Sequence, residues 1–325
     1  MHHRRYCDDH LFEVTQRTNR GECLFDCNDQ GLRAEIDGLL AHAQERYGVA
    51  IYAYHFMSNH YHGLFGAPSA QQFADFLAYF HGGLARLVNR CRGQRGHVWG
   101  GRARVVAVAT DEASLVSRLR YILGQASRAG MVTHPLAFPG SSSSRALAYG
   151  ESIVGRTVNW TAQCRDRRLV GGPKSADAYE TLREVKLSPL PCWSHVNEAA
   201  RRRLYRAITD DVGDQKVEQK APLCQTHESA AENRIAIAKV ADPVDDAGRP
   251  RLVGDVANRG RAPLILAATE VQRKAYRELL KAFEAEYAAA RAELLRQVSR
   301  KQAGLRVRAV TFPRFSFPGG GLRGL

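Results

Sequence analysis

The chain has 325 residues, of which 44% are hydrophobic and 25% charged, as in a soluble protein with one large or two ordinary domains. Its formal net charge of +14 favours a polyanionic partner, with a basic but inert surface as the alternative. The seven cysteines lack the paired spacing of a zinc ribbon or a disulfide framework. No apolar run approaches the length of a membrane span. We therefore expect a reduced, cytoplasmic protein without membrane association.

Strand and helix patterns alternate through the first half of the chain. Short alternating runs predict strands at 11–17, 49–57, 60–65 and 102–109. Apolar residues at steps of three and four predict helices at 28–46, 68–89 and 112–128. The first six of these elements have the order strand, helix, strand, strand, helix, strand. This order predicts an α+β domain with a ferredoxin-like (βαββαβ) antiparallel sheet, followed by one more helix that packs on the sheet.

The third predicted strand begins with His60-Tyr61-His62. Because side chains alternate along a strand, His60 and His62 leave the same face of the sheet and Tyr61 leaves the other. Neutral imidazole is the commonest metal ligand, so this pair supplies most of a small metal site. The alternative is a pair of ordinary surface histidines on an edge strand.

The helix predicted at 112–128 carries two stripes at helical spacing. The apolar stripe, which should pack on the sheet, comprises Leu115, Leu119, Ile122 and Ala126. The polar stripe comprises Ser114, Arg118, Tyr121, Gln125 and Arg128. A single tyrosine is usually a core or rim residue whose hydroxyl has a partner. The polar neighbours of Tyr121 argue instead for a role in chemistry.

These residues together suit phosphoryl transfer. A tyrosyl oxygen can attack phosphorus and keep the phosphoryl group as a covalent ester. With an ordinary pKa of about 10, it needs a cation or a base to react at neutral pH. A divalent metal, Mg²⁺ or Mn²⁺, held by His60 and His62 would polarise the phosphate, and Gln125 can add a third ligand. Arg118 and Arg128 would flank the site as phosphate clamps.

Several motifs of the first half resemble the HUH single-tyrosine transposases, and most closely their REP-associated tyrosine transposase group. The motifs are 14–17, 57–64, 98–102, 120–122, 128–132 and 141–150, in the family's order and spacing. The resemblance implies a nuclease domain that acts on single-stranded DNA, usually beside a hairpin, often as a homodimer. It implies metal ligation by His60, His62 and Gln125, and attack by Tyr121 to form a 5′-phosphotyrosine and release a 3′-hydroxyl.

The chain departs from the family pattern at two places. Ala126-Ser127 stands where the family usually has Asn-Pro, and Ala103 stands where an aromatic residue is common. Neither change removes a predicted catalytic atom. The arginines that we expect to contact nucleic acid are Arg17, Arg102, Arg104, Arg118 and Arg128. In a bacterial cell such a protein would be associated with the nucleoid.

The domain boundaries follow changes in composition. We assign 1–150 to the transposase domain and 151–211 to a basic, partly helical extension. We expect a linker at 212–263, a long amphipathic helix at 264–303 and a flexible tail at 304–325. The long helix has a coiled-coil-like seam, which serves either to dimerise or to fold back onto the domain.

The leading functional hypothesis is a metal-dependent single-stranded DNA transposase and endonuclease that cleaves and rejoins DNA near hairpins. The main alternative is a domesticated, non-catalytic protein that binds hairpin DNA. A relaxase or replication initiator is disfavoured because its tyrosine usually precedes the histidine pair. An unrelated metallohydrolase using His60 and His62 would remain active without Tyr121.

Overall fold

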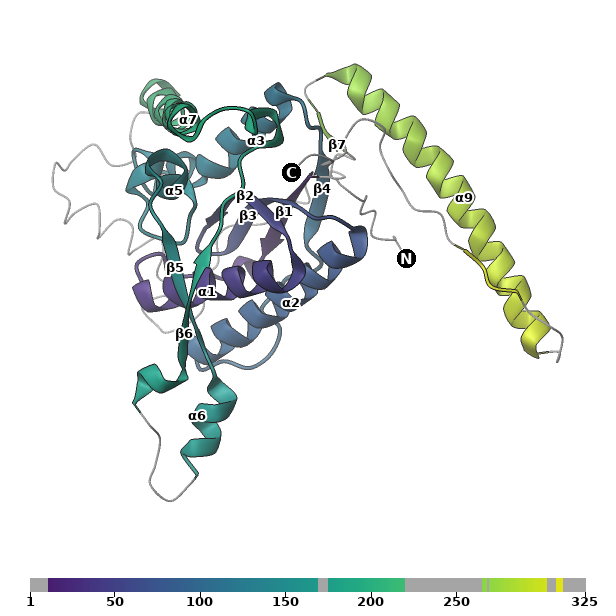
Figure 1. Ribbon diagram of the computed structural model, residues 1–325, viewed down its shortest axis with the longest axis horizontal. Helices are drawn as coiled ribbons and strands as arrows, with labels where there is room; N and C mark the ends of the chain where they lie inside the picture. Colours follow the sequence, from purple (N-terminus) through teal and green to yellow (C-terminus); the bar gives the residue numbers. More distant parts are fainter. Residues whose placement is uncertain (1–10, 169–174, 220–264, 268, 303–307, 312–325) are drawn as a thin grey trace.

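A computed structural model describes residues 11–168, 175–219, 265–267, 269–302 and 308–311 (Figure 1). The predictions for the N-terminal ten residues, for most of the linker and for most of the tail lie outside these ranges. The strands are β1 (Leu11–Arg17), β2 (Ala50–Phe56), β3 (His60–Gly66), β4 (Arg104–Val108), β5 (Ile153–Val158), β6 (Glu180–Val185) and β7 (Ile265–Leu266). The helices are α1 (Gln30–Tyr47), α2 (Ala70–Cys91), α3 (Glu112–Leu123), α4 (Gln125–Arg128), α5 (Ser144–Tyr149), α6 (Trp160–Asp166), α7 (Glu198–Gln219) and α9 (Glu270–Gln302).

The main sheet confirms the ferredoxin-like prediction. Its strand order is β2-β3-β1-β4-β7, and β1 to β4 pair antiparallel throughout. The predicted helix starts hold too, since Asp29 caps α1 and Ser69 caps α2 by accepting a hydrogen bond from a backbone N–H. The fifth strand is a correction: β7 pairs with β4 in parallel, at a position expected to lie in the long helix.

Helices cover both faces of this sheet (Figure 1), and a separate hydrophobic core lies on each face. The face toward α1 and α2 is packed with aromatic rings, among them Phe12, Phe65, Phe73, Phe76 and Phe80. The face toward α3 and α7 is filled mainly by aliphatic residues of α3, with Trp193 and Tyr205 from the chain after residue 185. The sheet is therefore buried on both faces, and the predicted site lies on the α3 face.

The helix predicted at 112–128 is two helices, which corrects the sequence-based boundary. α3 ends at Leu123, and α4 begins at Gln125 after the junction residue Gly124. A Cβ at Gly124 would lie 2.8 Å from the Arg120 carbonyl oxygen and 2.8 Å from Val212 of α7. Glycine is therefore needed where α7 crosses the junction.

The extension after residue 150 packs on the domain and is not purely helical. β5 and β6 form an antiparallel hairpin, and Ile153 and Val185 join the core beneath α1. At the crossing, a Cβ on Gly155 would lie 1.9 Å from the backbone N of Gly38, so only glycines allow this approach. Residues 212–219, predicted as linker, are the last turns of α7.

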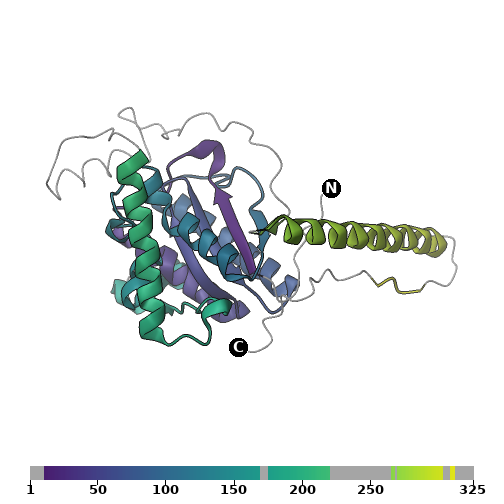
Figure 2. The same cartoon turned by 90° about the horizontal axis from the view of Figure 1, so that it is seen from above.

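The long C-terminal helix α9 starts against the domain and then runs away from it (Figures 1 and 2). Thr269 caps it by accepting a hydrogen bond from the backbone N–H of Gln272 at 3.2 Å. Tyr276 and Leu280 are buried in the core on the α1–α2 face, whereas Leu294 and Val298 are 39% and 45% exposed. The first turns of the seam therefore fold back onto the domain, and the rest of it is open.

No helix in the described part of the chain has both the length and the apolar character needed to cross a membrane. The five cysteines in the same ranges are free thiols, as predicted for Cys23 and Cys27.

Candidate active site

His60 and His62 lie on the α3 face of β3, as the strand alternation predicts. Their ring centroids are 5.1 Å apart with the ring planes nearly perpendicular, at 84°. Tyr61, between them, is fully buried on the opposite face, where its ring stacks on Phe56. The two imidazoles therefore face one space, and the residue between them anchors the strand in the aromatic core.

Polar groups of β1 orient the His62 ring. Thr15 lies opposite His62 in the β1–β3 register, and its Oγ1 is 3.0 Å from His62 Nδ1. The carboxylate of Glu13 lies 3.6 Å from the same nitrogen and is itself 3.6 Å from the Arg118 guanidinium. A carboxylate beside Nδ1 favours the tautomer with the proton on Nδ1, which leaves the Nε2 lone pair for a metal.

His60 is held neutral and oriented by its neighbours. Burial, together with the smaller effects of the charges of His62 and Arg17, lowers the pKa of His60 to about 3. His60 Nδ1 donates to Asn59 Oδ1 at 2.6 Å, so its Nε2 carries the lone pair. The side chain of Gln125 also hydrogen-bonds His60, an interaction that raises the pKa of His60 slightly. Neutral imidazole is the form that binds metals.

Tyr121 lies over His62. Its half-buried ring meets His62 edge to face, with centroids 5.1 Å apart and planes at 88°. The guanidinium groups of Arg118 and Arg128 lie 5.4 and 5.3 Å from the centroid of the Tyr121 ring. The Arg128 guanidinium also donates to the Tyr121 carbonyl at 3.3 Å. Two cations at the ring of Tyr121 would attract a phosphate to it.

Gln125 remains next to Tyr121 despite the break between α3 and α4. Its Nε2 donates to the Tyr121 carbonyl oxygen at 2.9 Å. The amide oxygen takes no part in this bond and is the atom of Gln125 that could bind a cation. The structure thus places Tyr121, His60, His62 and Gln125 together, as the sequence predicts.

The five arginines expected at nucleic acid divide between the two faces. Arg118 and Arg128 flank Tyr121, and the charge of Arg17 acts on His60. Arg104 lies opposite Thr15 in the β1–β4 register and is exposed, so it shares the face of the histidines. Arg102 does not join them, because it lines a cavity on the α2 side of the sheet.

The sequence analysis missed three polar residues of the site: Glu13, Thr15 and His55. His55 lies opposite His62 in the β2–β3 register and is fully buried, with its Nδ1 3.0 Å from Ser142 Oγ. Burial lowers the pKa of His55 to about 3, and no described residue partners its Nε2. The two-residue turn at 58–59 was the signal that aligns His55 with His62.

The donor set suits one divalent cation better than a closed structural metal. Among the described residues no three His, Cys, Asp or Glu side chains lie close enough to hold a metal together. Two imidazoles and one amide oxygen therefore make an open, incomplete shell, and a cation in it would keep positions for phosphate oxygens. The neutral state of His60 and the contacts that orient the His62 ring fit this role.

Comparison with known families identifies this part of the chain. Residues 15–125 match the family model of the IS200-like transposases, and this segment holds both histidines, Tyr121 and Gln125. Residues 15–125 are therefore similar to the IS200-like transposases. The resemblance to single-tyrosine transposases seen in the sequence is confirmed for this segment.

The chain is similar to several solved structures, including the following two. A REP-associated tyrosine transposase bound to a REP hairpin is 19% identical over 46% of this chain and 86% of that chain, with a TM-score of 0.38. A transposase candidate from Deinococcus radiodurans R1 is 21% identical over 38% of this chain and 97% of that chain, with a TM-score of 0.26. Similarity at this level adds nothing about function. A search of the curated proteins found no match.

Proposed function

We propose that the protein is a metal-dependent DNA transposase that cleaves and rejoins single-stranded DNA beside hairpins through Tyr121. One observation carries the proposal: Tyr121 lies over His62, between two arginines, and beside the His60–Gln125 pair. The matched family supports the transposase class, and the net charge of +14 suits a nucleic-acid partner.

The residues divide the reaction between them. Tyr121 Oη would form a bond to phosphorus while the bond from phosphorus to the 3′-oxygen breaks. The tyrosyl proton passes to solvent, and the released 3′-oxygen takes up a proton to become a hydroxyl. The DNA then remains attached to Tyr121 through its 5′-phosphate, and attack by a new 3′-hydroxyl reverses the step and rejoins the strand.

A divalent cation such as Mg²⁺ or Mn²⁺, held by His60, His62 and Gln125, would polarise the phosphate when bound. The arginines supply the second part of the charge. Arg118 and Arg128 lie at the ring of Tyr121, where they can bind the phosphate oxygens. Glu13 keeps Arg118 in place from the buried side of the site.

The test is formation of a denaturant-stable protein–DNA adduct. The full chain is incubated with hairpin-bearing single-stranded DNA and Mg²⁺ or Mn²⁺, then separated on a denaturing gel. We expect an adduct that requires the metal and disappears in Tyr121→Phe, with Tyr149→Phe, at an exposed tyrosine outside the site, as the control. Absence of any adduct across suitable hairpins would support the alternative, a non-catalytic hairpin-binding protein. An adduct that persists in Tyr121→Phe would refute the assigned nucleophile.

The homodimer expected from the family resemblance stays a prediction. The open seam on α9, with Leu294 and Val298 exposed, is the part of the described chain best suited to pair with a second copy. Sedimentation equilibrium of the full chain with and without hairpin DNA would measure the oligomeric state.

A further inference from the structure

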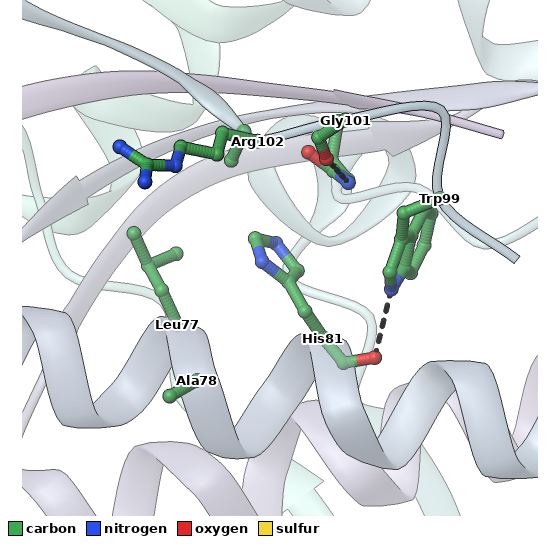
Figure 3. Close-up of a pocket in the computed structure, with 8 residues that line it drawn as sticks. Leu77, Ala78, His81, Trp99, Gly101 and Arg102 are labelled. Carbon is green, nitrogen blue, oxygen red and sulfur yellow. Dashed lines mark hydrogen bonds between the residues drawn. The ribbon is translucent and has the colours of Figure 1, made fainter. Parts of the chain in front are cut away.

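A cavity lies on the face of the sheet opposite Tyr121, between α2 and the loop at 99–103 (Figure 3). Its volume is about 240 Å³, below the range of about 300–1,000 Å³ for pockets that hold drug-sized ligands. Ala78, Gly101 and Arg102 line it and are solvent-exposed, so it opens at the surface. Its size suits a single flat ring system.

The walls carry the chemistry that recognises a nucleobase. Trp99 and His81 provide two aromatic rings whose centroids are 5.6 Å apart, and Figure 3 shows both rings on the cavity wall. Gln16 contributes a buried amide, and Arg102 extends along the rim (Figure 3). Aromatic faces stack on any base, whereas an amide and a guanidinium read the polar edge of a base.

Hydrogen bonds hold the walls in place without a ligand. Trp99 Nε1 donates to the His81 carbonyl at 3.0 Å, and Gln16 Nε2 donates to the Gly101 carbonyl at 3.0 Å. The backbone N–H of Gly100 donates to the Arg17 carbonyl at 3.1 Å, which ties the loop to the end of β1. The cavity is therefore preformed, which lowers the entropic cost of binding.

The cavity is connected to His60 and His62 through neighbouring residues of β1 and β3. Gln16 lies opposite Tyr61 in the β1–β3 register, and Tyr61 separates His60 from His62. The Tyr61 hydroxyl is 2.6 Å from His81 Nε2, on the cavity wall. Arg17, which follows Gln16, influences His60 on the other face. A strand with one phosphate at His60 and His62 would reach the cavity by passing round this end of the sheet.

The geometry points to a binding site for one unpaired nucleobase of the same single strand that Tyr121 cleaves. The base enters between α2 and the 99–103 loop and stacks against Trp99 and His81. Because the cavity is fixed relative to His60 and His62, an inserted base sets which phosphate reaches Tyr121. The inference rests on the proposed function, and it names the recognition element that selects the cleavage position.

The test fills the cavity with a larger side chain and measures whether DNA affinity still depends on one base. Ala78→Leu adds volume at the rim on an exposed helical position, where leucine is well tolerated. Ala74→Leu is the matched control, one turn earlier on α2 and outside the cavity lining. Gly101→Val is a second filling variant, since a Cβ at Gly101 meets no atom within 4 Å. All are made in Tyr121→Phe, so that binding is measured without cleavage.

The probes are hairpin-bearing single-stranded oligonucleotides with one abasic site at each flanking position in turn, and fluorescence anisotropy at fixed salt measures the dissociation constant. We expect one position where base removal weakens binding of the parent about tenfold or more. In Ala78→Leu and Gly101→Val the intact DNA binds as weakly as this abasic DNA, and the position no longer matters. Ala74→Leu behaves as the parent.

Two results would overturn the nucleobase site: no flanking base matters, or the filled variants keep the sensitivity of the parent. The proposed function is judged separately, by adduct formation in the protein that retains Tyr121. An adduct without a base-sensitive position removes the cavity inference alone, whereas absence of the adduct removes the catalytic proposal.

Discussion

The two faces of the main sheet have different roles: the α1–α2 face stabilises the fold, and the α3 face carries the candidate active site. On the α1–α2 face, stacked phenylalanines form a dry core in which Phe73, Phe76 and Phe80 follow one another along α2. On the α3 face, the strands present Glu13, Thr15, His55, His60 and His62 beneath Tyr121. β3 belongs to both faces, because Tyr61 enters the aromatic core while its two neighbours enter the site. A two-residue period thus lets one strand anchor the fold and also present the ligands.

The largest expected effect comes from breaking the aromatic face. Phe80 is fully buried, with its ring 5.7 Å from Phe76 and 5.8 Å from Tyr61. Phe80→Ala should lower the free energy of unfolding by about 3–5 kcal/mol, because it removes contacts and leaves a cavity. Urea unfolding followed by circular dichroism measures this change. A loss below about 1 kcal/mol would show that this face is not the main source of stability.

Removing a metal ligand from the α3 face should lower metal affinity rather than the free energy of unfolding. His62→Ala should lower Mn²⁺ affinity more than about 100-fold, since even the partners of metal ligands are worth 10–100-fold. Titration calorimetry measures the affinity, and His97→Ala, at an exposed loop histidine, is the control. Unchanged Mn²⁺ binding in His62→Ala would place the metal elsewhere.

A smaller loss should follow from removing the hydrogen bond to His62. Thr15→Val keeps the shape of the side chain but deletes the Oγ1 that lies 3.0 Å from His62 Nδ1. We expect Mn²⁺ affinity to fall about tenfold, because the tautomer and ring orientation of His62 are less well fixed. Thr181→Val, on an exposed position of β6, should leave the affinity unchanged. Equal affinities in the two variants would contradict the orienting role of Thr15.

The smallest effect concerns pH and the buried His55. Its pKa is lowered to about 3 in the folded protein, whereas in the unfolded chain it is near 6.5. The unfolded state therefore binds a proton that the folded state rejects, and stability falls as pH decreases below about 6.5. Between pH 6.5 and 5.5 this histidine should lower the free energy of unfolding by about 1 kcal/mol. In His55→Gln, the free energy of unfolding measured with urea should fall by about 1 kcal/mol less over this pH range. An unchanged pH dependence would contradict the lowered pKa of His55.

Sequence periodicity predicted the parts of the molecule that depend on local pattern. The alternation at 60–62 placed both histidines on one face, and the turn at 58–59 placed β2 beside β3. Helical spacing gave the polar stripe that holds Tyr121 and Gln125, although Gly124 divides the helix. These features survive because they are set by residues within a few positions of each other.

Contacts between distant segments account for what the sequence did not predict. The helix break at Gly124 depends on the approach of Val212, and the partner of His55 is Ser142. The parallel pairing of β7 with β4 joins residues more than 150 positions apart. The cavity beside Trp99 likewise needs β1, α2 and the 99–103 loop together. No local pattern marks such neighbours, because they follow from the final packing.

The account is tested most directly by locating the DNA on the protein. Full-length protein is incubated with Mn²⁺ and hairpin-bearing single-stranded DNA, digested with protease and nuclease, and analysed by mass spectrometry. We predict one modified peptide, with a nucleotide 5′-phosphate attached to Tyr121 and a free 3′-hydroxyl on the released strand. Attachment to any other residue, or cleavage without a covalent peptide, would contradict the assignment of Tyr121 as the nucleophile.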